Sequence, residues 1–188
     1  MTRAEAVKKS IQSPANRNNY REQIQIKEGA KGFGYKKLFD RFLEQGDVTK
    51  VWVEDPYIRS SHQIENFCHF CEVVLASQSS VSSISLITTK DAQANNSNPK
   101  HDQVQKFHIL KNDLATQNVN FKWEFDASLH DREIRFDNGW IVKIGRGLDY
   151  VRSTGHHFCG LGVHDYDYRP CSSTTVDIFH QSTLANSQ

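Results

Sequence analysis

A regular alternation of amphipathic helical segments with short apolar strands, between residues 34 and 125, constrains the fold of this chain most strongly. Strands that are separated by helices pair in parallel, with right-handed crossovers that place the helices on the faces of the sheet. At 188 residues the chain is long enough for one such domain. The apolar periodicity predicts helices over 34–45, 61–76 and 101–117, and strands over 48–53, 82–88, 119–125 and 176–179.

The segment 130–147 predicts an antiparallel hairpin that carries polar chemistry. The Asn-Gly pair at 138–139 is a strong turn signal between two apolar runs. His130 and Arg132 lie two apart in an alternating run, so on a strand both side chains project from one face. Asp137 follows five residues later. The hairpin therefore makes the sheet mixed and gathers an imidazole, a guanidinium and a carboxylate, a set suited to gripping phosphate.

This segment resembles the signature of the phospholipase D superfamily, in which His, any residue, Lys, four residues and Asp precede Gly-Ser-any-Asn. His130, Arg132 and Asp137 keep the first spacing, but a planar guanidinium replaces the family's compact ammonium. In the second part Arg146 replaces the small Ser, and Leu148 stands where the family has a phosphate-binding Asn. The resemblance implies an active site made from two such signatures. This chain carries one, so a complete site implies a homodimer.

A narrower resemblance covers most of the chain, from about residue 33 to residue 180. Its stretches are VWVEDPYIRSSHQIENFCHFCE, HDREIRFDNGWIVKIGRGLDY, YDYRPC and TTVDIFH. They are similar to the phospholipase D-like C-terminal domains of MIT proteins. This similarity implies a phospholipase D-like α/β/α sandwich with a mixed β-sheet and a single half-site copy.

The same resemblance implies several partners and places of action. Such domains form homodimers, bind acidic phospholipid membranes and act with ESCRT-III in the abscission step of cytokinesis. It further implies a cytoplasmic, peripheral membrane protein at the midbody and at late endosomal membranes. ESCRT-III subunits bind through an N-terminal three-helix MIT domain. Residues 1–32 are too few for that domain, so we expect it to be absent from this chain.

We expect three regions along the chain. Residues 1–32 are polar and predict a linker or N-terminal extension, residues 33–182 the phospholipase D-like domain, and residues 183–188 a tail. The polar start lacks the apolar core of a signal peptide, and no run approaches the ~18 apolar residues of a membrane span. A net charge of +1 argues against a general nucleic-acid-binding surface. We therefore expect an intracellular protein that touches membranes peripherally and binds neither nucleic acid nor a cofactor.

The cysteines and the acidic clusters have a structural and a functional interpretation each. Cys68 and Cys71 have CxxC spacing, but helical periodicity places both thiols on a buried stripe, and we favour core packing over a metal site. The HDYD run at 164–167 is more typical of a turn than of a metal site. Asp55 follows a strand where α/β folds place their sites, although we favour a turn before Pro56. No metal is expected.

Basic side chains form two candidate surfaces for acidic lipid. The first mixes lysines with aromatic residues in the segment 27–37, for which a solvated linker is the alternative interpretation. The second surrounds the hairpin, where Arg135 and Lys143 are expected to face each other across the turn. The candidate phosphate- or lipid-binding residues are Arg132, Arg135, Lys143, Arg146, Lys31, Lys36 and Lys37.

Three functions remain open from the sequence. The first is a non-catalytic domain that binds acidic phospholipid, with a degenerate signature at His130, Arg132 and Asp137, in which Asp137 would orient the imidazole in any active version. The second is a homodimeric phosphodiesterase that uses His130 from each subunit. The third is a protein-interaction module in which the hairpin cluster is structural.

Overall fold

The protein forms a seven-stranded mixed sheet covered by three helices. The structure is a computed structural model that describes residues 21–45, 47–92, 102–156 and 159–181. Its strands lie in the order β1-β7-β6-β5-β2-β3-β4. The elements are β1 Arg21–Ile26, α2 Tyr35–Leu43, β2 Lys50–Glu54, α3 Ser61–Ala76, β3 Ser83–Thr88, α4 Gln103–Thr116, β4 Asn120–Phe125, β5 Glu133–Phe136, β6 Trp140–Ile144, η3 Gly147–Tyr150, η4 Tyr166–Tyr168 and β7 Thr174–His180.

The sheet has a parallel half and an antiparallel half that meet at β2. Strands β2, β3 and β4 pair in parallel because a helix separates each from the next. The other pairs, from β2–β5 through to β7–β1, are antiparallel. The predicted α/β fold with a mixed sheet is confirmed, and the helices and strands predicted between residues 34 and 125 are all present.

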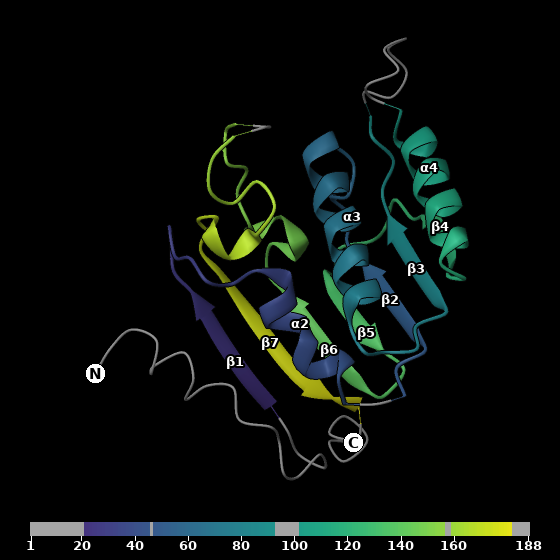
Figure 1. The fold of residues 1–188 in the computed structure, drawn as a ribbon, viewed down its shortest axis with the longest axis horizontal. Coiled ribbons are helices and arrows are strands. Elements are labelled where there is room, and N and C mark those ends of the chain that lie inside the picture. Colours follow the sequence, from purple (N-terminus) through teal and green to yellow (C-terminus); the bar gives the residue numbers. More distant parts are fainter. Residues whose placement is uncertain (1–20, 46, 93–101, 157–158, 182–188) are drawn as a thin grey trace.

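The three helices lie on one face of the sheet, as Figure 1 shows. The ring of Phe42 on α2 stacks on Phe136 of β5, and Phe67 of α3 packs on Phe121 of β4. On α4, Phe107 contacts the same Phe121 ring. These rings are fully or almost fully buried and form the core. Within the described residues, the helices therefore form one layer of the expected sandwich, and the opposite sheet face carries none.

The sequence around Ser60 fixes where helix α3 begins. The Ser60 hydroxyl accepts a hydrogen bond from the Gln63 backbone N–H, and the Gln63 side chain accepts one from the Ser60 backbone N–H. This arrangement is a capping box, which satisfies two N–H groups that the first turn leaves without helical partners. Because the cap fixes the start of α3, it also fixes the path of the chain from the carboxyl end of β2.

Strand β1 lies within the predicted N-terminal extension. We expected residues 1–32 to be a linker or N-terminal extension, and residues 21–26 of this segment pair with β7, from Arg21 opposite Phe179 to Ile26 opposite Thr174. The sequence REQIQI alternates polar and apolar residues, which is a strand signal, and Ile26 is buried. The signal was weak because Ile24 and Ile26 are its only apolar residues. Residues 1–20, the rest of the predicted linker, and 183–188, the predicted tail, lie outside the described residues.

The β5–β6 hairpin turns at the predicted Asn-Gly pair. Gly139 has φ +95°, which favours glycine, and its N–H donates to the Phe136 carbonyl at 3.0 Å. A side chain at Gly139 would meet the imidazole of His180, which lies against the turn. The Asn138 amide donates to the Phe42 carbonyl at 3.0 Å and so ties the turn to α2.

No helix in the described ranges combines the length and the apolar character that crossing a bilayer requires.

Candidate functional site

The signature residues of the sequence lie at one edge of the sheet, where strands β2 and β6 end. Both strands are antiparallel to β5, so they run in the same direction and their carboxyl ends lie together. The chain continues from β2 into Asp55, and from β6 through the turn at 145–147 into η3. Arg132 immediately precedes β5 and therefore lies at this same edge.

A buried carboxylate occupies the centre of this edge. Asp55 is 3% exposed, and its Oδ1 accepts the Tyr57 backbone N–H at 2.9 Å. This is the turn that we favoured from the sequence. The carboxylate also accepts the Leu148 backbone N–H. Burial raises the pKa of Asp55 to about 6, although both N–H groups and the nearby Arg132 guanidinium act in the opposite direction.

Gly147 allows the Asp55 carboxylate to lie against the backbone. It has φ +58°, and a Cβ at this position would overlap the carboxylate and lie 3.3 Å from Cδ of Arg132. The cavity that remains among Asp55, Arg132, Gly147 and Leu148 measures about 10 Å³. That is the space of about one water molecule. The pocket at the signature is therefore filled by protein, and it excludes a phosphate group.

Arg132 is held at the rim of the filled pocket. Its Nη1 donates to the Gly145 carbonyl at 3.0 Å, and its guanidinium carbon lies 4.0 Å from the centre of the Tyr57 ring. A second guanidinium, that of Arg59, lies 5.1 Å from the centre of the same ring. Tyr57 is 40% exposed. Two cations and one aromatic ring thus form a rim at the edge of the sheet, with Arg146 exposed in the turn after β6.

The structure does not bring His130 and Asp137 together. We predicted that His130 and Arg132 share a strand face, but β5 begins only at Glu133, and His130 is exposed in the loop before it. Asp137 lies at the opposite end of β5, where it accepts hydrogen bonds from the backbone N–H and the hydroxyl of Thr49. At ~3.3 Å per residue, the strand separates Arg132 from Asp137 by roughly 16 Å. Asp137 therefore does not orient His130.

Arg135 and Lys143 do not face each other across the hairpin, contrary to our prediction. The register places Lys143 opposite Glu133 and places Arg135 opposite Ile141. Both cations instead form ion pairs with the buried Glu133, Lys143 at 3.3 Å, and Arg135 also lies 3.8 Å from Glu54. Two cations and two carboxylates cancel, so this cluster on the helix-free face has no net positive charge.

The lysine-rich segment 27–37 lies beside the rim. The Tyr150 hydroxyl donates to the Phe33 carbonyl at 2.6 Å, and the Tyr35 hydroxyl donates to the Leu148 carbonyl. These bonds join the segment to η3. Its lysines Lys31, Lys36 and Lys37 are exposed, and Lys36 forms an ion pair with Asp40 at 2.6 Å.

The imidazole of His62 also lies at this edge of the sheet, and we did not predict it from the sequence. Its Nε2 lies 3.4 Å from Oδ1 of Asp149 in η3, and the hydrogen bond with Asp149 raises the pKa of His62. The signal was absent because His62 and Asp149 are far apart in the sequence. Tyr57 and Arg59 were missed for a different reason: only the fold places them beside Arg132.

A family model and a relative agree with the resemblance to the C-terminal domains of MIT proteins. A family model described as the phospholipase D-like domain at the C-terminus of MIT matches residues 32–180. MIT domain-containing protein 1 of Mus musculus is 43% identical over 180 residues, which cover 96% of this chain and 70% of that protein. The crystal structure of phosphatidylserine synthase from Haemophilus influenzae Rd KW20 is 14% identical, with a TM-score of 0.46. It aligns with 94% of this chain, which spans 39% of the synthase chain.

Replacing Gly147 with Ala tests the close approach of Asp55. Gly155→Ala is the matched control, because Gly155 also has positive φ, at +74°, but a Cβ added there would meet nothing within 4 Å. We expect Gly147→Ala to lower the free energy of unfolding by about 3 kcal/mol and Gly155→Ala by about 1 kcal/mol. Urea unfolding measures both. Equal losses would contradict the close contact between Asp55 and Gly147.

The raised pKa of Asp55 predicts a pH dependence of stability. The folded protein holds the Asp55 proton up to a pKa of about 6, whereas the unfolded chain loses it near ~3.9. Its contribution to the free energy of unfolding is therefore complete below pH ~4 and falls by about 3 kcal/mol as the pH rises through 6. Asp55→Asn should lack this decrease. Urea unfolding between pH 4 and pH 7 tests it, and parallel curves for the two proteins would refute the assignment.

Proposed function

Because the chain belongs to the family of phospholipase D-like domains at the C-terminus of MIT proteins, we propose that it binds acidic phospholipid surfaces without hydrolysing them. The single observation that carries this proposal is the Tyr57 rim, where two guanidiniums flank one exposed aromatic ring above a filled pocket. Aromatic rings and cations together suit the interface between water and anionic headgroups.

Binding without turnover is supported by the contents of the pocket. A phosphodiester at the signature would have to displace the Asp55 carboxylate, which two backbone N–H groups hold against Gly147. A negative group in that position repels phosphate rather than stabilising it. His130 lies in the loop outside the pocket, and Leu148 offers no side-chain donor. The catalytic use of the signature therefore has no support in this geometry.

The lipid contact that we propose differs from the one that the sequence suggested. It consists of Arg59, Arg132 and Arg146, with Lys31 and Lys37 on the adjoining segment. Lys36 contributes less because Asp40 partly neutralises it. Arg135 and Lys143 are left out because their charges are balanced by Glu133 and Glu54 on another face. Each cation near an anionic surface adds about 1 kcal/mol of binding free energy.

We further propose that the domain works as a homodimer. The helix-free face supports this part, because it holds a hollow of about 610 Å³ beside Trp52, Ile141 and Phe179. Trp52 is among the exposed large apolar side chains of the described residues. Charges of both signs surround the hollow, as a two-fold interface between identical surfaces needs. We also propose that the protein acts with ESCRT-III subunits in abscission and is located at midbody and late endosomal membranes.

Liposome sedimentation tests the rim. The protein should sediment with vesicles that contain phosphatidylserine, less at high salt, and little with neutral phosphatidylcholine vesicles. Arg59→Glu with Arg146→Glu should weaken binding at least ~30-fold, since two cations at about 1 kcal/mol each are lost. The control pair Lys50→Glu and Lys122→Glu changes the net charge equally at exposed positions on β2 and β4, and should have little effect.

Three outcomes would overturn the proposal. Equal binding to neutral vesicles, or an equal loss of binding in the control pair, would remove the role of the rim. Phosphodiester hydrolysis that disappears in His130→Ala would favour the homodimeric phosphodiesterase.

A further inference from the structure

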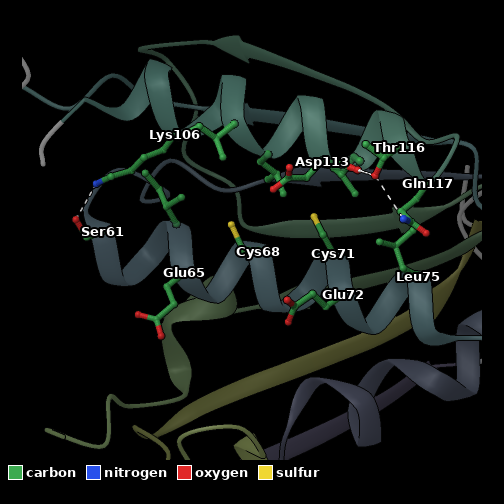
Figure 2. Close-up of a pocket in the computed structure, with 14 residues that line it drawn as sticks. Ser61, Glu65, Cys68, Cys71, Glu72, Leu75, Lys106, Asp113, Thr116 and Gln117 are labelled. Atoms are coloured by element: carbon green, nitrogen blue, oxygen red, sulfur yellow. Dashed lines mark hydrogen bonds between the residues drawn. The ribbon is translucent and has the colours of Figure 1, made fainter. Parts of the chain in front are cut away.

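A long groove runs between helices α3 and α4, away from the rim. Figure 2 shows its two walls, with the thiols of Cys68 and Cys71 directed from α3 toward α4. The groove has a volume of about 610 Å³. Its lining extends along α3 from Ser61 to Leu75, which at 1.5 Å per residue is a length of about 21 Å.

The groove is open because α3 presents short side chains where it faces α4. Cys71 is buried, and Cys68 is half-buried and packs against the core, so the predicted core packing of the two thiols agrees with the structure. Leu75 on α3 is 37% exposed, and Ile109 on α4 is 56% exposed. The walls therefore offer apolar side chains to an occupant that the described residues do not supply.

The charges along the groove are mainly negative. Glu65 and Glu72 on α3 and Asp113 on α4 line it. Lys106 lies at one end, where its ammonium donates to the Ser61 hydroxyl at 2.8 Å. The rest of the groove thus combines an apolar floor with carboxylates on both sides. Such a surface attracts a cationic partner and repels an anionic membrane.

We propose that this groove binds an amphipathic helix of a partner protein, with apolar residues at i, i+3, i+4 and i+7 and lysines or arginines beside them. The length matches a helix of about 14 residues. An extended peptide fits less well, because the backbone groups of α3 and α4 are bonded within the helices and offer no strand edge. A helix satisfies its own backbone and needs only side-chain contacts.

Two synthetic helical peptides test the groove. Both have 18 residues with leucine at the apolar positions, and the remaining positions are lysine in one peptide and glutamate in the other. We expect the lysine peptide to bind with a micromolar Kd at low salt, with NMR shifts of backbone amides confined to α3 and α4. The glutamate peptide should not bind.

Matched variants make the test specific. Glu72→Lys with Asp113→Lys should weaken binding of the lysine peptide at least tenfold and permit binding of the glutamate peptide. Glu44→Lys with Glu124→Lys makes the same change in net charge at exposed positions outside the groove and should leave both results unchanged. Cys68→Phe, which fills the groove, should also abolish binding. Spectra with the dispersion of the wild type establish that each variant is folded.

The inference is overturned by any of three results. These are no binding of the lysine peptide, equal binding of the two peptides, or shifts that map to elements other than α3 and α4. It is also overturned if the groove variants and the control pair behave alike. Binding to vesicles does not enter this test, so its failure is independent of the function proposed for the rim.

Discussion

The position of the Asp55 carboxylate determines what the signature edge of this domain can do. Two backbone N–H groups hold it, Gly147 leaves room for it, and its burial raises its pKa to about 6. In this position it leaves a cavity of only about 10 Å³ beside Arg132, Gly147 and Leu148. Arg132 therefore lies at the rim, between the Gly145 carbonyl and the Tyr57 ring. The edge of the sheet thus presents an exposed cationic and aromatic surface above a filled pocket.

Because the helices cover one face of the sheet, the domain presents two further surfaces, one on each face. The helix-free face carries a hollow beside Trp52 whose lining includes the balanced charge cluster around Glu133, and this surface suits a second copy of the chain. The helical face carries the acidic groove between α3 and α4, which suits a cationic helix. Opposite signs of charge at the rim and in the groove would allow one domain to contact a membrane and a partner protein together.

The sequence predicted the fold better than the site. Periodicity located α3 at its observed bounds because the Ser60 cap and the apolar stripe agree, and the Asn-Gly pair located the hairpin. The strand at 21–26 was missed because only two apolar residues mark it. At the site, spacing along the chain predicted that His130, Arg132 and Asp137 lie close together. In the structure, His130 and Arg132 precede β5 and Asp137 follows it, so the strand separates them. Arg59 and His62 approach the edge through tertiary packing, which spacing does not encode.

A crystal structure of the protein with short-chain phosphatidylserine would show whether the headgroup binds at the rim or enters the signature pocket. We expect a phosphate group on the outer side of the rim, within reach of Arg59, Arg132 or Arg146, while the Asp55 carboxylate remains against Gly147. A phosphate group inside the signature pocket, with Asp55 displaced and His130 turned toward phosphorus, would contradict it.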